Sequence, residues 1–406
     1  MDFAGRFFKG DRVIWIIFLC FCLISIIEVF SAASTLTYKT GDHWGPITQH
    51  CVFLMVGTVI VLIVHNINYK FFQVLPLLLI PLSIALLLYV SIKGGLINDA
   101  ARWINIFGFT FQPSEIAKMG VIISVSLILS KNQEEDVANK KAFKYILIVT
   151  GVICALIVGE NFSTAVLLFG VVFLMMMIGR IEWKKLGLLF VALLLLGIII
   201  LFLPIRRSET WRNRIIDKIE NRNHVPPEKY DIDDNAQVAH ANIAIATSGI
   251  VGKMPGNSVQ RDFLPQAFSD FIFAIIIEEL GLIGGIFVVF LYLWLLIRTG
   301  KIAQKCERTF PAFLIMGIAL LLVVQAFMNM FVAVGIMPVT GQPLPLISKG
   351  GTSTLINCVY IGIILSVSRY TMRLEQLKAQ NIEESEAQAI VENEYDNMVE
   401  ISNKSS

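Results

Sequence analysis

The apolar residues of this chain are gathered into long runs that are separated by shorter polar segments. Ten of these runs hold about 20 residues each, which is the length of helix that crosses ~30 Å of hydrocarbon. The predicted helices are residues 13–33, 51–67, 71–92, 114–130, 143–159, 162–179, 184–204, 270–297, 310–336 and 352–372. The pattern therefore predicts an all-α polytopic membrane protein with about ten transmembrane helices.

The short loops between these helices differ in their content of Lys and Arg. With a cytoplasmic N-terminus, fifteen basic residues lie in the short cytoplasmic segments and four in the short outer loops. Because basic residues accumulate in cytoplasmic loops, both termini are predicted to be cytoplasmic. The chain then divides into an N-terminus (1–12), a ten-helix membrane domain (13–372) and an acidic tail (373–406), which we expect to be disordered.

The amino-acid composition agrees with a membrane protein and argues against a nucleic-acid partner. Of the 406 residues, 56% are hydrophobic and 16% are charged, whereas an average soluble domain carries about 25% charged residues. The 33 Lys and Arg residues exceed the 31 Asp and Glu residues by two, which leaves a formal net charge of +2. Because nucleic-acid affinity depends on many cationic phosphate contacts, no nucleic-acid partner is expected.

Polar residues at membrane depth are costly unless they are paired or hydrated, so their positions point to function. One group lies at an outer helix end: Arg102-Trp103, then Gln112-Pro-Ser-Glu-Ile-Ala-Lys118. Glu115 and Lys118 are three residues apart and share one helix face. They form either an interfacial ion pair or, with Arg102, a site for an anionic group such as phosphate.

A second group lies in and after the long outer loop, residues 205–269. Ala241–Gly252 has the pattern of a short interfacial helix, and the loop leads into Asp270 at the start of the eighth predicted helix. Asp270 is either a helix cap or a general base whose pKa its surroundings can tune. Glu278 and Glu279 follow about two turns later, and either belong to the site or bond to a neighbouring helix.

A third group is the loop Met337-Pro-Val-Thr-Gly-Gln-Pro-Leu-Pro-Leu-Ile-Ser-Lys-Gly-Gly-Thr-Ser353. Its prolines and glycines predict a fixed non-helical shape, and its apolar character predicts that it enters the outer leaflet. Non-helical backbone at that depth must be buried in protein or line a hydrated space. Ser348 and Lys349 are therefore candidate site residues.

Motifs in these segments, in this order, resemble the shape, elongation, division and sporulation family, whose members include FtsW and RodA. The resemblance covers roughly residues 10–372. The motifs are Asn98-Asp-Ala-Ala-Arg-Trp-Ile104, Gln112-Pro-Ser-Glu-Ile-Ala-Lys118, Phe263-Leu-Pro-Gln-Ala-Phe-Ser-Asp-Phe-Ile-Phe273 with Glu278-Glu-Leu-Gly281, and Pro338-Val-Thr-Gly-Gln-Pro-Leu-Pro-Leu-Ile-Ser348. Gly256-Asn-Ser-Val-Gln-Arg261 and the C-terminal extension favour the FtsW-like division branch.

The resemblance implies an inverting peptidoglycan glycosyltransferase that polymerises lipid II at the outer face of the cytoplasmic membrane. It implies a class b penicillin-binding protein and other cell-division proteins as partners, and Asp270 as the essential general base. Substrate contacts are expected from Arg102, Trp103, Glu115, Lys118, Asn257, Ser258, Gln260, Ser348 and Lys349. No cofactor is firmly implied, although a divalent cation, Mg²⁺ or Mn²⁺, is one way to stabilise the leaving pyrophosphate.

The chain departs from the family pattern at three places. Glu160-Asn-Phe-Ser-Thr164 stands where an Asp-Leu/Phe-Gly-Thr type of sequence is common, Phe268-Ser269 where His-Thr is frequent, and Lys349 where Tyr is usual. These departures leave Asp270 in place.

Two other functions stay open at this point, a lipid II flippase and a scaffold without catalytic activity. A flippase needs polar residues at mid-depth on several helices. Apart from Glu278 and Glu279, the sequence places Gln325 and Asn329 there and little else. The outer polar cluster therefore favours chemistry at the membrane surface.

Overall fold

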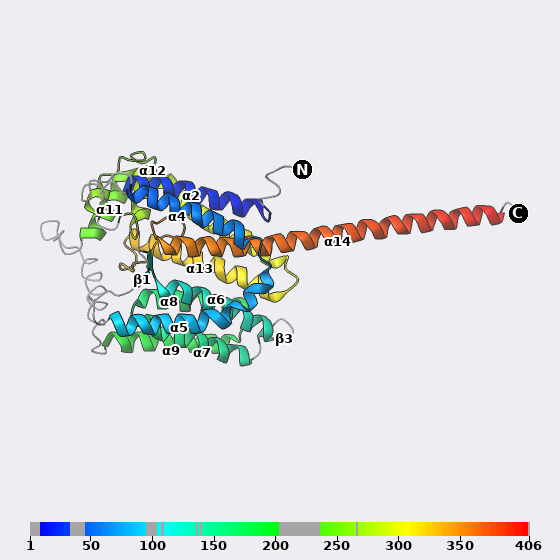
Figure 1. Cartoon of the computed structure of the whole chain (residues 1–406), viewed down its shortest axis with the longest axis horizontal. Helices are drawn as coiled ribbons and strands as arrows, with labels where there is room; N and C mark the ends of the chain where they lie inside the picture. Colours follow the sequence, from blue (N-terminus) through cyan, green and yellow to red (C-terminus); the bar gives the residue numbers. More distant parts are fainter. Residues whose placement is uncertain are drawn as a thin grey trace.

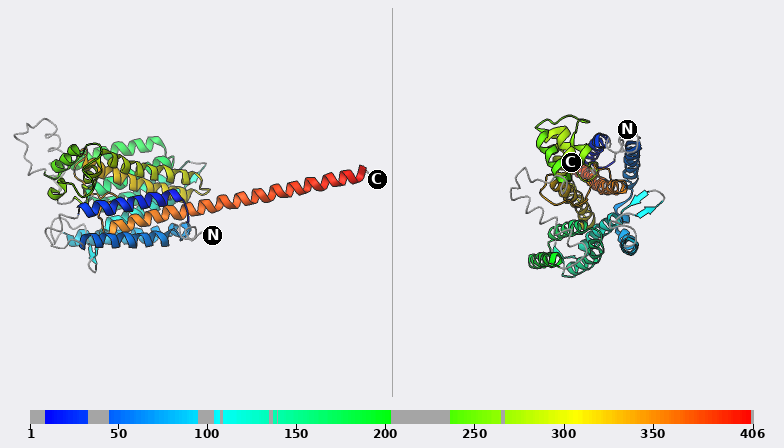
Figure 2. Two further views of the ribbon diagram at one scale, coloured as in Figure 1. Left: turned by 90° about the horizontal axis from the view of Figure 1, so that it is seen from above. Right: turned by 90° about the vertical axis from the view of Figure 1, so that its left-hand side faces the viewer.

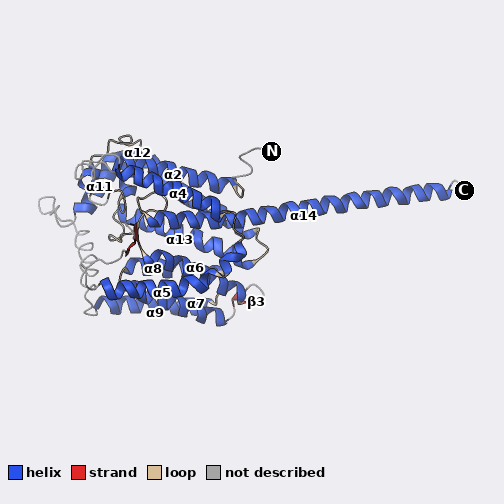
Figure 3. Ribbon diagram, viewed as in Figure 1, coloured by secondary structure: helices blue, strands red, loops and turns tan. Residues whose placement is uncertain are grey.

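The computed structural model describes residues 9–32, 45–94, 104–106, 109–134, 137–138, 140–202, 236–264 and 267–404. Long helices that run side by side make up most of this part of the chain (Figure 1, Figure 3). They are α2 (Arg12–Ala32), α4 (Gly45–Val64), α5 (Leu75–Gly94), α6 (Pro113–Lys131), α7 (Lys140–Val158), α8 (Phe162–Ile178), α9 (Trp183–Phe202), α12 (Ile272–Gln304), α13 (Thr309–Ala333) and α14 (Thr352–Lys404). Each predicted membrane helix coincides with one of them.

Within the described residues, eight of these helices are long and apolar enough to cross a membrane, and α8 is a shorter apolar helix of 17 residues. The prediction of an all-α polytopic membrane protein is confirmed. The remaining elements are short: the 3₁₀ helices η1 (Tyr69–Gln73) and η3 (Gln260–Phe263), the helix α11 (Ala236–Ser248), and two antiparallel hairpins. The hairpins pair β1 (Ile104–Ile106) with β2 (Phe109–Phe111), and β3 (Gln133–Glu134) with β4 (Val137–Ala138).

Helix α13 lies at the centre of the bundle. Over an apolar stretch of 18 residues in α13, 78% of the residues are buried, whereas the corresponding share is 22% in α4 and in α5. It packs against α6, α8, α12 and α14. Polar side chains on α13 are therefore held inside the protein, away from lipid.

The two ends of the bundle differ in structure (Figure 1, Figure 2). α11 and β1 lie at one end, whereas α2 begins at the opposite end and α14 leaves the bundle there. α11 and β1, which both belong to predicted outer segments, therefore lie at the same end of the molecule, as a site built from several loops requires.

Several boundaries differ from the prediction, and three of the differences have a clear local cause. α4 begins six residues before residue 51, because Pro46 is tolerated in the first turn of a helix. α11 ends at Ser248, not at Gly252, because Gly249 has a left-handed φ of +66° that ends the helix. The segment from residue 373, expected to be disordered, continues α14 to Lys404, and it contains neither Gly nor Pro to break the helix.

A break in α12 separates the stretch that follows Asp270 from the rest of the helix. Gly281 has φ +72° and ψ −174°, which lies outside the helical region. At this point Gly252 of the outer loop packs directly on the α12 backbone, so that an added Cβ on Gly252 would lie 2.3 Å from the Glu279 carbonyl oxygen. Leu282 and Ile283 donate backbone hydrogen bonds to Gly249 and Ile250 across the break.

Replacing Gly281 with Ala should therefore destabilise the protein. The new Cβ would lie 2.2 Å from the Ile250 carbonyl oxygen, and the backbone conformation itself costs ~1–3 kcal/mol for residues other than Gly. We expect a lower Tm in a thermal unfolding scan of the purified protein in detergent. Gly151→Ala in α7 is the matched control, because nothing lies within 4 Å of its added Cβ. It should keep or raise the Tm, and equal Tm values for the two variants would contradict this account.

Candidate active site

The buried ion pair at the start of α6 is the first component of the site. The Lys118 Nζ lies 2.8 Å from the Glu115 Oε1, and the two side chains are 0% and 3% exposed. Pro113 occupies the first turn of α6, so Glu115 lies near the positive end of the helix dipole. The predicted shared helix face is confirmed. Lys118 also donates a hydrogen bond of 2.9 Å to Gln325 of α13.

Two amides on α13 connect this pair to the loop that follows α13. Gln325 and Asn329 are one helical turn apart and both are buried. Gln325 donates to the Pro343 carbonyl oxygen at 3.1 Å. Asn329 donates to the carbonyl oxygens of Gln342 and Asp270, at 2.8 and 2.9 Å. The side chains on α13 therefore hold both the loop and the backbone of Asp270.

The segment 338–351 is non-helical backbone packed inside the protein, as its sequence predicts. Leu344, Leu346 and Ile347 are each at most 1% exposed. Other helices also bind the loop: Ser25 of α2 donates to the Ile347 carbonyl oxygen at 2.7 Å, and Tyr292 of α12 donates to that of Pro345. The polar groups of the segment thus find partners inside the bundle.

Asp270 lies in the turn that precedes α12 and is half-buried. Its neighbours are fixed by the loop: Ser348 donates to the Ser269 carbonyl oxygen at 2.7 Å and accepts from the Leu344 amide at 2.8 Å. The Ser269 hydroxyl donates to the Asp270 Oδ1 at 3.1 Å. Asp270 is therefore a carboxylate with a fixed backbone and a side chain that is less buried than Glu115.

Lys349 brings a positive charge to the same turn. Its amide donates to the Phe268 carbonyl oxygen at 3.0 Å, and its Nζ lies 5.6 Å from the centroid of the Phe268 ring. This cation–π contact joins two of the positions at which the sequence departs from the pattern that it otherwise resembles. Burial lowers the pKa of Lys349 below its ordinary value, because a partly desolvated ammonium group favours the neutral form.

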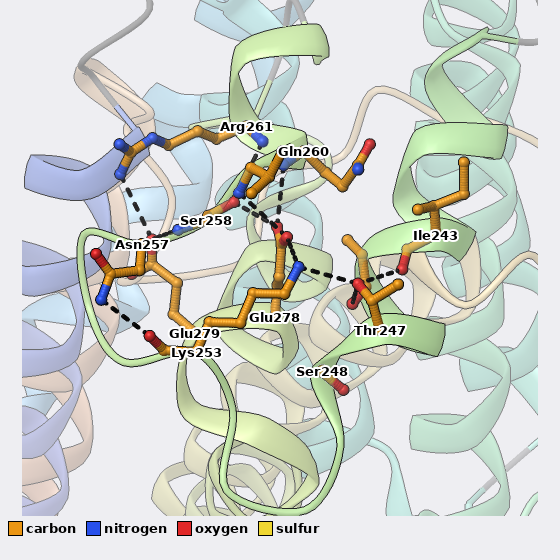
Figure 4. Close-up of polar contacts among 12 residues, drawn as sticks. Ile243, Thr247, Ser248, Lys253, Asn257, Ser258, Gln260, Arg261, Glu278 and Glu279 are labelled. Carbon is orange, nitrogen blue, oxygen red and sulfur yellow. Dashed lines mark hydrogen bonds and ion pairs between the residues drawn. The ribbon is translucent and has the colours of Figure 1, made fainter.

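A second polar cluster surrounds Glu278 and Glu279, and three of the predicted substrate contacts lie there (Figure 4). Ser258 is buried and donates its hydroxyl to Glu278. The backbone amide of Gln260 donates to Glu278, and the Gln260 side-chain oxygen accepts from the Nδ1 of His240 at 2.7 Å. Asn257 is exposed and donates to the Lys253 carbonyl oxygen at 3.0 Å. In this structure these residues contact the α12 carboxylates and their own segment.

The structure thus brings together Glu115, Lys118, Asp270, Ser348 and Lys349, which the sequence placed in one site. Arg102 and Trp103 lie outside the described residues. All of these substrate roles stay predictions.

Sequence reasoning overlooked two buried polar residues, Gln342 and Glu28. Gln342 donates to the Thr164 hydroxyl at 2.7 Å and so links the loop to α8, whose first turn is capped by Asn161. Glu28 of α2 is 0% exposed, and within the described residues neither of its carboxylate oxygens has a hydrogen-bond partner. Glu28 lies within an apolar run of the sequence. A carboxylate at membrane depth is costly, and this alone could have marked Glu28 as a residue of interest.

The described residues contain no group of three or more His, Cys, Asp or Glu side chains placed to hold a metal ion. A divalent cation would therefore need ligands from substrate or water in addition to a side chain such as Asp270.

Comparison with known proteins identifies relatives over nearly the whole membrane part. The family model for FtsW, RodA and SpoVE, described as cell cycle protein, matches residues 11–373. The probable peptidoglycan glycosyltransferase FtsW of Geobacter metallireducens is 30% identical over 370 residues, which cover 89% of this chain and 95% of the relative. Stage V sporulation protein E of Bacillus subtilis is 29% identical over 366 residues, which cover 89% and 97%.

A solved structure has the same fold. One chain of a peptidoglycan synthase complex, studied for its coordination of polymerization and crosslinking, superposes with a TM-score of 0.72. It is 24% identical, and the match covers 89% of this chain and 98% of that one.

Removing the charge of Lys118 should destabilise the protein far more than removing an exposed lysine. In Lys118→Met the buried Glu115 loses its partner, and breaking a buried ion pair costs ~3–5 kcal/mol. Lys185→Met is the matched control, because Lys185 pairs with Glu182 at the same spacing and at 2.9 Å with side chains 27% and 46% exposed. Lys185→Met should lower the free energy of unfolding by only ~0–1 kcal/mol.

Thermal unfolding in detergent measures both effects, and the double variant Glu115→Gln with Lys118→Met should recover part of the lost Tm. Similar Tm changes for Lys118→Met and Lys185→Met would show that the buried pair does not hold α6 in place.

Proposed function

The chain belongs to the FtsW/RodA/SpoVE family of cell cycle proteins, and from this premise we propose that it is a peptidoglycan glycosyltransferase that polymerises lipid II during cell division. The observation that carries the proposal is the position of Asp270. Hydrogen bonds from Asn329 and Ser348 fix the backbone around this carboxylate, while its side chain stays half-buried at the loop-rich end of the bundle. A general base needs such a fixed and reachable position.

In the reaction that we propose, Asp270 takes the proton of the 4-hydroxyl of an acceptor sugar. The acceptor oxygen bonds to the anomeric carbon of the donor glycan, and the bond from that carbon to the lipid pyrophosphate breaks. The pyrophosphate leaves with the bonding electrons and gains negative charge in the transition state. One carboxylate acting as base without a second nucleophile gives inversion at the anomeric carbon.

The geometry suggests which cation stabilises the leaving group. Lys118 is fully buried and already neutralised by Glu115, so its main effect is to orient the α13 amides. Lys349 is half-buried, and its backbone amide bonds to Phe268, two residues before Asp270, so that its ammonium group lies in the neighbourhood of the same turn. We assign the direct contact with the pyrophosphate to Lys349, together with Arg102 or a divalent cation.

The location and the partner follow from the same proposal. Lipid II holds its pyrophosphate at the level of the lipid headgroups and its disaccharide outside, so the site should face the outside of the cytoplasmic membrane. The basic residues of the short loops support this orientation. A class b penicillin-binding protein that crosslinks the new strands is the proposed partner, together with other cell-division proteins, and the shared fold with a chain of a peptidoglycan synthase complex supports it.

The contacts on α13 favour this function over lipid II transport. A flippase needs polar side chains that face a hydrated path. Gln325 and Asn329 instead donate their amide hydrogens to carbonyl oxygens of Pro343, Gln342 and Asp270, inside the protein. A scaffold without activity, in turn, would not need a carboxylate whose backbone is fixed by buried side chains.

Replacing Asp270 with Asn should abolish polymerisation and leave the protein folded. General-base assistance accounts for about 10²–10⁴ in rate, so glycan strands should fall below detection. The assay incubates the full-length protein and its partner transpeptidase with labelled lipid II and penicillin, and resolves the strands on a gel.

Asp262→Asn is the matched control, because Asp262 is an exposed carboxylate of the same outer segment, with a side chain 51% exposed. It should polymerise at the wild-type rate. Strands made by Asp270→Asn at a near wild-type rate would remove Asp270 from the mechanism. Movement of lipid II across liposomes without any polymer would select the flippase.

A further inference from the structure

Glu278 and Glu279 are the two carboxylates at the end of the helical stretch that follows Asp270. Both are 0% exposed and both precede the break at Gly281. Adjacent residues on a helix point about 100° apart, so each carboxylate contacts a different set of groups. Figure 4 shows the outer segment, residues 253–261, wrapped around the two side chains.

Glu278 binds four groups of this segment. The Lys253 Nζ lies 2.6 Å from its Oε1, and the Ser258 hydroxyl donates to its Oε2. The backbone amides of Val259 and Gln260 donate to the same carboxylate at 3.2 and 3.3 Å. Burial of this negative charge is therefore compensated by one cation and three hydrogen-bond donors.

Glu279 binds the other face of the segment and also reaches α2. The amides of Gly256 and Ser258 donate to it at 3.1 and 3.3 Å, and the hydroxyl of Ser31 on α2 also donates to it. The Arg261 Nη1 lies 3.7 Å from its Oε1 and donates to the Ser31 hydroxyl at 2.7 Å. Two carboxylates and two cations thus leave the cluster without net charge.

The turn that contains Asp270 leads directly into the same short helix. Within α12 the backbone is helical from Ile272 up to Gly281, so this stretch moves as one body. The helix rises about 9 Å from Ile272, its first residue, to Glu278. Asn329 and Ser348 hold the end near Asp270, and the outer segment holds the far end through the two carboxylates.

We propose that Glu278 and Glu279 are positioning residues, which set the height and rotation of the helix that presents Asp270 by docking it on residues 253–261. This inference rests on the proposed function of Asp270. The carboxylates touch no reacting atom and act through the helix. Their charge is required, because four backbone amides, two hydroxyls and two cations converge on their oxygens. It follows that a displacement of residues 253–261 would also displace the Asp270 carboxylate.

Glu278→Gln tests the inference, since it removes the charge and keeps the size of the side chain. In the lipid II assay with the full-length protein and its partner we expect kcat to fall ~10- to 100-fold, the loss that follows from a base displaced by about 1 Å. KM for lipid II should stay within about threefold, as expected when no substrate contact is removed. Hydrogen exchange of residues 253–263 should become faster, while that of α13 stays protected.

Lys253→Met removes the same ion pair by changing its basic residue, whose side chain is 28% exposed. This variant tests the inference even if Glu278→Gln fails to fold. It should lower kcat in the same direction, and Lys253→Arg should restore at least half of the wild-type kcat. Glu182→Gln is the matched control, because it breaks an exposed ion pair of α9's first turn and should keep kcat.

The outcomes separate this inference from the proposed function. If Asp270→Asn is inactive while Glu278→Gln and Lys253→Met keep the wild-type kcat, the positioning role is wrong and the function stands. A rise in KM without a fall in kcat would make the cluster a substrate site and would equally overturn the positioning role. If Asp270→Asn polymerises lipid II, the proposed function itself is wrong.

Discussion

The need of buried backbone carbonyl groups for hydrogen-bond donors is the constraint on which the outer end of this protein depends. The segment 338–351 is not helical, so its carbonyl oxygens lack the partners that a helix would supply. Side chains from α2, α12 and α13 supply them, and Asn329 serves the loop and Asp270 with the same amide group. Because one donor group holds both, the loop cannot shift without affecting the proposed catalytic residue.

Burial distinguishes the charges that hold the fold from those at the proposed site. The buried charges Glu115, Lys118, Glu278 and Glu279 each have an opposite charge within 4 Å, and they fix helices and the outer segment. Asp270 and Lys349 are only half-buried, and they lie in the segments that the buried groups hold in place. The distinction is physical, since a fully buried ion pair is costly to open for a substrate, whereas a half-buried group can be reached.

The sequence predicts what depends on local patterns. Ten apolar runs give ten helices, and the spacing of Glu115 and Lys118 gives their ion pair. Contacts between segments distant in the chain were not accessible, because no period or spacing encodes them. Ser258 and Gln260 were expected at the substrate and lie on Glu278, some 20 residues further along. Glu28 is concealed by its apolar neighbours, and the start of α4 depends on how a helix accommodates Pro46.

The contact between Gly252 and Gly281 limits how this sequence can vary. At each position an added Cβ would meet backbone atoms of the opposite segment, at 2.3 and 2.2 Å. A second substitution elsewhere cannot relieve such a clash by shortening a side chain, because the obstacle is main chain on both sides. The two positions are therefore expected to tolerate no other residue in any descendant of this chain that keeps the same join between the outer loop and α12. Another residue at either position would first require an insertion or deletion that moves the outer loop away from α12.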